Sequence, residues 1–159
     1  MSTNAQVLKF IELKSGYNDD GPAWIARVKL SKSGRTIYFD GRALKQGGRG
    51  ASGNFFDRTT GERFWISNVK RDGTDRHWAG SGKVLIEAAA VEDYLATIGA
   101  RELDTSRLIV TTEIRETDPA DFVDAENARL GSGKCSERAE HDITRMAARP
   151  RRGATASSA

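Results

Sequence analysis

Cysteine, histidine and long apolar runs are scarce in this chain of 159 residues. Cys135 is the only cysteine, which excludes a disulfide framework and a cysteine-based zinc site within one chain. No apolar run approaches the ~20 residues that a membrane helix needs. The first residues, Met1 to Phe10, show no basic start followed by an apolar stretch, so we expect no secretory signal. The resulting expectation is a cytoplasmic protein that does not enter a membrane.

Complete nucleotide-binding motifs are also missing. The Gly-Lys pairs that end at Lys83 and Lys134 lack both the earlier glycine and the following Ser or Thr of a phosphate loop, which excludes an ATPase of that type. Residues 48–53 do fit G-x-G-x-x-G, but Phe55 and Phe56 continue as a strand, whereas a dinucleotide-binding loop leads into a helix. We expect a mobile loop between two strands, in which Arg49 can contact a polyanion.

Charge is distributed unevenly along the chain. Residues 27–83 hold 13 Lys and Arg against 5 Asp and Glu, whereas residues 100–128 hold 3 basic and 8 acidic residues. Seven aromatic residues lie within the basic stretch. This mixture suits single-stranded nucleic acid, because phosphates attract cations and bases stack on flat side chains. The alternative is that the aromatic residues form the core of a barrel and the charges solvate its outside.

The first hundred residues alternate apolar and polar residues in the manner of β-strands. We expect strands at 7–13, 24–30, 36–39, 54–57, 62–66, 84–86 and 108–112. Short turns at 32–35 and 58–61 predict two hairpins, and 45–54 is a glycine-rich loop. The prediction is a mainly β (α+β) fold, a small antiparallel barrel or curled sheet of the SH3-like or OB type. A sheet with a helix across one face is the alternative.

The period of the apolar pattern changes after the sixth expected strand. Val91, Tyr94, Leu95 and Ile98 share one helical face, and Gly99 follows where a left-handed cap is expected. We therefore predict a β-rich domain over 1–116 that contains a packed helix at 87–98. An acidic helix over 117–130, capped by its first residues, and a flexible basic tail over 131–159 should follow.

The densest cluster of functional side chains extends from Lys70 to Lys83. Its two carboxylates and one imidazole, Asp72, Asp75 and His77, could bind a metal or perform acid–base chemistry. Its cations could instead hold an anion beside a tryptophan. The structural alternative is a turn in which Asp75 pairs with its neighbour Arg76 while Trp78 packs in the core.

Four segments resemble a family of small, uncharacterised bacterial proteins: FIELKSGY at 10–17, GPAWIAR at 21–27, SKSGRTIY at 31–38 and WISNVKRDGTDRHWAGSG at 65–82. The similarity covers residues 7–126, and members of this family often carry the label 1-deoxy-D-xylulose-5-phosphate synthase. That synthase is a far longer thiamine-diphosphate enzyme whose magnesium is held by Gly-Asp-Gly, and residues 71–73 lack the first glycine. The resemblance therefore implies a shared fold and binding surface, without catalytic residues.

We predict a non-enzymatic binding module for single-stranded or flexible nucleic acid, with no cofactor, no catalytic residue and no metal. We predict phosphate contacts by Lys45, Arg49, Lys70, Arg71, Arg76 and Lys83. We predict that the bases stack on Phe55, Trp65 or Trp78, with His77 as a further contact. A protein-interaction module is the first alternative, docking through the barrel edge or residues 118–126. The second alternative is an enzyme centred on Asp72, Asp75 and His77.

Overall fold

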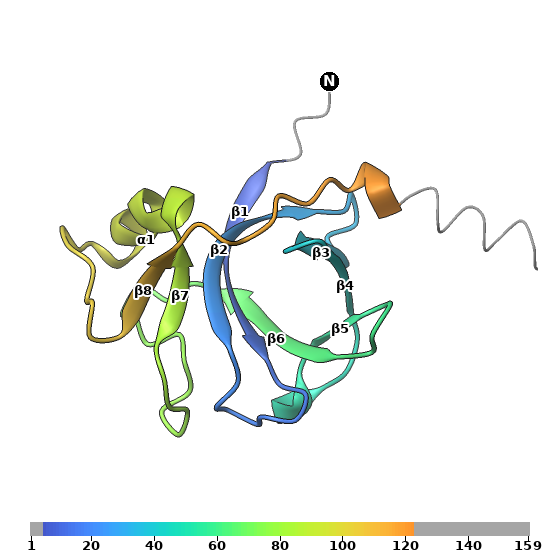
Figure 1. The fold of residues 1–159 in the computed structure, drawn as a ribbon, viewed down its shortest axis with the longest axis horizontal. Helices are drawn as coiled ribbons and strands as arrows, with labels where there is room; N and C mark the ends of the chain where they lie inside the picture. Colours follow the sequence, from blue (N-terminus) through green and yellow to red (C-terminus); the bar gives the residue numbers. More distant parts are fainter. Residues whose placement is uncertain (1–4, 123–159) are drawn as a thin grey trace, which may run out of the picture. The chain divides into compact units, whose positions relative to one another are not determined.

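The computed structural model describes residues 5–122, and one compact unit that ends at Pro119 contains all of its strands (Figure 1). The strands are β1 (Gln6–Leu13), β2 (Ala23–Leu30), β3 (Thr36–Phe39), β4 (Arg42–Gln46), β5 (Phe55–Asp57), β6 (Arg63–Asn68), β7 (Val84–Glu87) and β8 (Leu108–Thr111). The helical elements are two short 3₁₀ turns, η1 (Gly50–Ser52) and η2 (Ala88–Ala90), and the helix α1 (Val91–Ile98).

Strands β1 to β6 form an antiparallel barrel that closes through the pairing of β1 with β2. This confirms the prediction of a small, mainly β barrel. Strand β2 is the branch point, because Lys29 and Leu30 pair with β3 while Trp24 and Ile25 pair with β7. Strands β7 and β8 extend the sheet beyond the barrel, parallel to β2, as the helical connection between them allows. This parallel extension was not predicted.

Two apolar clusters share strands β1 and β2 as a common wall. Ile11 of β1 and Val28 of β2 pack inside the barrel, whereas Phe10 and Ile25 of the same strands pack outside it. The outer cluster is completed by β7, β8 and Tyr94 of α1. This arrangement explains why both faces of β1 are apolar in the sequence.

The helix prediction is also confirmed. Residues 88–90 form the turn η2, and α1 ends at Ile98 before Gly99, which adopts φ 69° and ψ 26°. Tyr94 is buried among β-strand side chains, and Ile98 is half-buried beside it. Because the helix faces the outer cluster, it forms one wall of the region that contains the candidate site.

Strand β4 was missed, because residues 40–44 were assigned to no element and residues 45–54 were expected to form a loop. Asp40 and Gly41 form the two-residue turn of the β3–β4 hairpin, and both have positive φ, as the twist of such hairpins requires. An Asp-Gly pair is a hairpin signal that could have revealed this strand. The loop that fits G-x-G-x-x-G lies between β4 and β5, as expected, and contains η1.

The predictions for the end of the chain are only partly covered by the described residues. Residues 120–122 are helical, while the rest of the predicted 117–130 helix and the 131–159 tail lie outside the described part. The hydroxyl of Thr117 accepts the backbone N–H of Gly41 at 2.7 Å and donates to the carbonyl oxygen of Arg115. Among residues 5–122, the structure contains no helix long and apolar enough to cross a membrane.

Gly53 offers a test of the loop between β4 and β5. It has φ 111°, and a Cβ there would lie 2.7 Å from the carbonyl oxygen of Phe64. We expect Gly53→Ala to destabilise the protein by more than ~1 kcal/mol, measured by urea denaturation, because it combines strain with a backbone clash. Gly61→Ala is the control, since Gly61 also has positive φ but no neighbour within 4 Å. Equal losses in the two variants would contradict the proposed clash.

Candidate functional site

The segment of residues 69–83, here called the crossover segment, connects β6 of the barrel to β7 outside it. Arg76 anchors it, because Nη2 donates to the carbonyl oxygens of Asp19 at 3.1 Å and Gly21 at 2.5 Å. Ser81 donates its N–H and its hydroxyl to Asp20 Oδ1. Figure 1 shows the crossover segment beside the β1–β2 loop at one end of the barrel.

Close packing at this anchor explains one glycine of the segment. A Cβ on Gly80 would lie 2.4 Å from the carbonyl oxygen of Asp19. The two chains can therefore approach each other only because position 80 has no side chain. This contact, together with the Arg76 hydrogen bonds, presents residues 77–79 at the surface.

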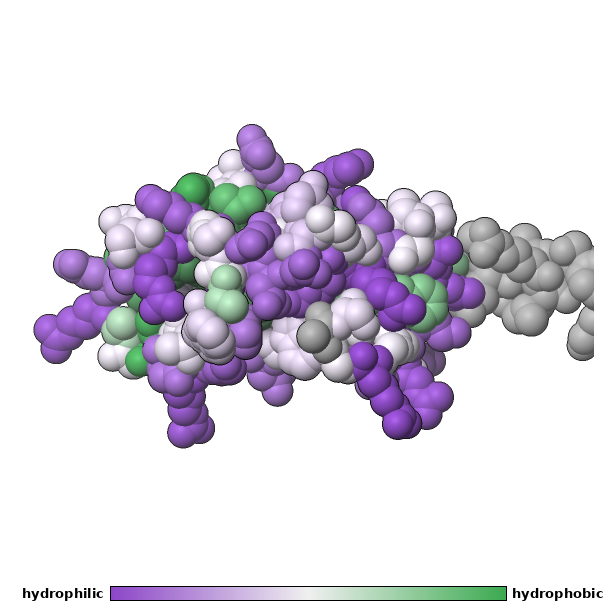
Figure 2. All heavy atoms as spheres, turned by 90° about the horizontal axis from the view of Figure 1, so that it is seen from below, coloured by the Kyte–Doolittle hydropathy of each residue, from purple (hydrophilic) through white to green (hydrophobic). Residues whose placement is uncertain are grey.

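Trp78 is 90% exposed, the highest exposure among the large apolar side chains of residues 5–122. The alternative that placed Trp78 in the core is therefore wrong. Its ring lies 5.5 Å from that of His77, with 43° between the planes. Figure 2 views the molecule from the loop end of the barrel, and charged and polar side chains cover most of that face. An indole with this exposure is available for stacking.

A cavity of about 540 Å³, here called the α1 cavity, lies between the crossover segment and the β7–α1–β8 unit. Ile25, Val84 and Leu108 from three strands supply apolar lining, and Tyr94 and Ile98 supply the α1 wall. The polar lining residues are Asp72, Asp75, Arg76, His77, Lys83, Asp104, Ser106 and Arg107. Trp78 also belongs to the lining, so the exposed indole and the cavity form one site.

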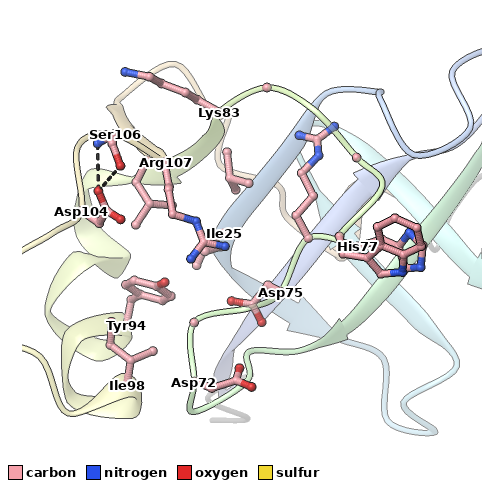
Figure 3. A pocket seen from close by; sticks show the side chains of 17 residues that line it. Ile25, Asp72, Asp75, His77, Lys83, Tyr94, Ile98, Asp104, Ser106 and Arg107 are labelled. Carbon is pink, nitrogen blue, oxygen red and sulfur yellow. Dashed lines mark hydrogen bonds between the residues drawn. The ribbon is translucent and has the colours of Figure 1, made fainter.

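Two cations lie on the wall formed by β7 and the α1–β8 loop. Lys83 donates to the carbonyl oxygen of Thr105 at 3.0 Å, and Figure 3 shows its side chain directed outward from the cavity. Arg107 reaches into the cavity, toward Asp75 and Tyr94 (Figure 3). Among the described residues, the structure records no carboxylate paired with Lys83 or Arg107. The charges of both cations contribute to the lowered pKa of Asp104, and that of Arg107 also acts on Asp75, but without a salt bridge each side chain can still contact an anionic or polar ligand.

The α1–β8 loop that carries Arg107 is held by a local carboxylate. Asp104 accepts hydrogen bonds from the hydroxyl and the N–H of Ser106, the latter at 3.0 Å. Both hydrogen bonds lower the pKa of Asp104, the one from the Ser106 hydroxyl more than the one from its N–H, so this carboxyl stays ionised. The N–H groups of Arg107 and Leu108 close the turn on the carbonyl oxygen of Asp104.

Asp75 is the least satisfied polar group of the site. It is 8% exposed, and its Oδ1 accepts the N–H of Lys70 at 2.7 Å, but its Oδ2 has no hydrogen-bond partner. Burial raises the pKa of its carboxyl above the usual 3.8. The same environment raises the pKa of Tyr94, first by burial and then through the charge of Asp75. Arg76 Nε is also unsatisfied and lies against Gly80.

A second cavity of about 500 Å³, here called the β1 cavity, lies on the other side of Asp75 and His77. A chain of polar contacts runs along it: Lys14 Nζ lies 3.1 Å from Glu12 and 2.5 Å from Asp19, whose other oxygen is 3.3 Å from His77 Nδ1. Burial alone would lower the pKa of Lys14, but its hydrogen bonds to Asp19 and Glu12 outweigh this effect and raise it. The Lys14 hydrogen bond is the main cause that lowers the pKa of Asp19.

Five of the predicted site residues meet around these two cavities. Lys70, His77 and Trp65 line the β1 cavity, while Trp78 and Lys83 line the α1 cavity, which also includes His77. Trp65 is half-buried and packs against the outer cluster.

The other predicted site residues do not join them in the expected roles. Phe55 is 8% exposed and belongs to the barrel core, so it offers no stacking face. Arg76 lines the α1 cavity but uses its guanidinium as the structural anchor. Arg71, Lys45 and Arg49 are exposed and line neither cavity, although Gly50, next to Arg49, lines the β1 cavity.

The metal alternative is not supported by the geometry. Asp72 Oδ1 accepts the N–H and hydroxyl of Thr74, Asp75 accepts Lys70, and His77 pairs with Asp19. Within residues 5–122, no three His, Cys, Asp or Glu side chains converge to hold a metal ion.

Four residues of the two cavities were missed by sequence reasoning. Glu12 lies within the apolar strand β1, and Lys14 follows directly after it. The charge of Glu12 on an apolar face of this strand was the one signal that the sequence offered. Arg107 and Tyr94 reach the α1 cavity only through the packing of the β7–α1–β8 unit, and no local pattern indicates this. Comparison with family models, with curated proteins and with solved structures finds no match.

The buried Asp75 carboxyl predicts a pH-dependent stability. Because its pKa in the folded protein lies above the unfolded value, the folded state holds this proton more strongly. Stability from Asp75 is therefore full below about pH 3.8 and is lost as the pH rises through the raised pKa. We expect Asp75→Asn to raise Tm at neutral pH and to remove this loss.

Asp72→Asn is the control for the Asp75 prediction. The pKa of Asp72 is lowered by its hydrogen bonds from Thr74, so removing this charge should not stabilise the protein. Profiles of Tm against pH for the wild type and for Asp75→Asn that stay parallel from about pH 3 to 8 would contradict the assignment.

The buried pair of Glu12 and Lys14 predicts a strong coupling. Their side chains are 1% and 8% exposed, so removing one leaves the other charge without its partner in the interior. Lys14 also pairs with Asp19, so it is the removal of Lys14 that leaves the buried Glu12 without its ion-pair partner, and we expect Lys14→Met to cost about 3 kcal/mol in urea denaturation. The double variant Glu12→Gln with Lys14→Met should recover part of that loss. Additive effects in this double-mutant cycle would show that the pair is not coupled.

Proposed function

We propose that this protein binds single-stranded nucleic acid, with one base stacked on Trp78 and neighbouring phosphates held by Lys83 and Arg71. The observation that carries the proposal is the 90% exposure of Trp78 on the rim of a cavity that Lys83 also lines. Exposing an indole removes the stability that burial would supply, unless a ligand covers it. A nucleobase is a flat ligand for that face, and stacking is worth ~1–3 kcal/mol per base.

The charges around Trp78 favour a nucleic acid over an uncharged aromatic ligand. Arg71 and Lys83 lie on the same crossover segment as Trp78 and are exposed. The charge of Lys83 contributes to the lowered pKa of Asp104, but within residues 5–122 the structure records no salt bridge to either cation. The stretch 27–83 that contains them holds 13 basic and 5 acidic residues. Phosphate contacts of this kind displace counterions, so the affinity should fall as salt rises.

A protein-interaction module is a second candidate, favoured by strand β8. Ile109 and Val110 are 46% and 52% exposed there. In the described residues, β8 pairs only with β7, so its other edge is available for a further strand. This candidate predicts a partner that stays bound after nuclease treatment and is lost when Ile109 and Val110 are both changed to Lys.

The main proposal is tested by fluorescence anisotropy of labelled single-stranded DNA and RNA at ~50 and ~200 mM salt, where phosphate contacts lose affinity visibly. We expect saturable binding that weakens with salt, and a loss of about 5- to 150-fold for Trp78→Ala. Tyr17→Ala is the matched control, because Tyr17 is 52% exposed but lines neither cavity.

The cation contacts are tested in the same assay. Arg71→Glu with Lys83→Glu should weaken binding and make it less sensitive to salt, without lowering Tm. Arg76 is left unchanged, because its loss would release the crossover segment from the β1–β2 loop. Absence of binding at low salt, or binding that salt does not affect, would overturn the proposal.

A further inference from the structure

The α1 cavity has the properties of a pocket for one nucleobase, and this inference rests on the proposed function. Its volume of about 540 Å³ lies within the ~300–1,000 Å³ of ligand sites. Strands β2, β7 and β8 supply apolar side chains on one side, and Tyr94 and Ile98 supply another. A flat, mostly apolar ring suits such a lining, while its polar edge needs specific partners.

Asp75 supplies the first polar partner. Its Oδ2 is buried and accepts no hydrogen bond, and a native buried polar atom without a partner calls for an explanation. An ionised carboxylate can only accept hydrogen bonds, so the group that would satisfy Oδ2 must be an N–H or O–H donor. The Asp75 residue lines the α1 cavity, so a donor that enters the cavity lies beside this carboxyl.

Arg107 supplies the second polar partner. Figure 3 shows Asp75 and Arg107 pointing toward each other across the cavity, yet the structure records no ion pair between them. A guanidinium only donates hydrogen bonds. The two side chains therefore match an edge that carries a donor beside an acceptor, inserted between them.

We propose that the α1 cavity selects a nucleobase that bears an exocyclic amino group, which donates to Asp75 while a neighbouring ring nitrogen or carbonyl accepts from Arg107. Cytosine presents an amino group beside an unprotonated ring nitrogen. Uracil carries a carbonyl in place of that amino group, so its oxygen would face the Asp75 carboxylate. The selected base occupies the cavity while an adjacent base stacks on Trp78 at its rim.

The test compares labelled oligo(dC) with oligo(dU) of about ten nucleotides, within the ~4–16 that single-stranded sites cover. The two bases differ only at the edge that Asp75 and Arg107 would contact. We expect wild-type protein to bind oligo(dC) at least about 5-fold more tightly, the lower limit for a specific base contact. Asp75→Asn should reduce that preference to about twofold or less, because an amide can both donate and accept.

Two further variants separate the pocket from the stacking face. Trp78→Ala should weaken the binding of both oligonucleotides by the same factor, so that the ratio of their two affinities stays the same. Ile98→Phe, which fills the cavity from α1, should abolish the preference and tests the pocket independently of Asp75. Circular dichroism establishes that each variant is folded.

The outcomes distinguish this inference from the function on which it rests. Binding of neither oligonucleotide by the wild type overturns the proposed function and the pocket together. Equal binding of both oligonucleotides overturns the base pocket alone. A preference that survives both Asp75→Asn and Ile98→Phe also overturns the pocket, because the selection would then come from another surface.

Discussion

The hydrogen bonds from Arg76 to the carbonyl oxygens of Asp19 and Gly21 are the contact on which the candidate site depends. The crossover segment must leave the barrel at β6 and return to the sheet at β7, outside the barrel wall. It contains no regular element of its own, so neither helical nor sheet hydrogen bonds hold it in place. A charged donor bonded to two backbone acceptors supplies that fixation more strongly than neutral groups would. The two cavities meet at Asp75 and His77, the two residues that flank Arg76 in the chain.

Sequence patterns predicted the elements whose hydrogen bonds are local or whose burial is periodic. Both hairpins, the central strand β1 and the end of α1 at Gly99 follow from alternation, turn residues and a left-handed cap. Strand β4 was missed because the local turn signal of Asp40 and Gly41 was not used, and because its pairing with β5 spans the glycine-rich loop. The parallel arrangement of β7 and β8 was missed because it depends on pairing with the distant strand β2. Long-range pairing is the information that a single sequence shows least.

The candidate site was only partly predictable for the same reason. The cluster of residues 70–83 was identified from its composition, but composition does not say which way each side chain points. Phe55 belongs to a strand, so its inward direction follows the pleat, while Trp78 belongs to an irregular segment without a pleat or helical face. Arg76 illustrates the limit most clearly: the sequence suggests a phosphate contact, whereas the fold uses its charge to bind backbone carbonyls. Glu12 and Lys14 were passed over although a charge in the apolar strand β1 is visible in the sequence, because their contact with each other and with Asp19 exists only in the folded protein.

Two departures from the rules of stable packing occur close together in the crossover segment. Trp78 exposes an apolar ring that other tryptophans of this fold keep at least half-buried, and Asp75 buries a carboxylate oxygen without a partner. Each departure makes the folded state less stable than it would be with a polar side chain at the exposed position and a neutral or fully hydrogen-bonded side chain at the buried one. The Arg76 anchor and Gly80 hold the segment without Trp78, whereas Asp75 holds it only through Oδ1, which accepts the N–H of Lys70. A ligand with a flat face and a donor edge would relieve both at once, and few other single partners would.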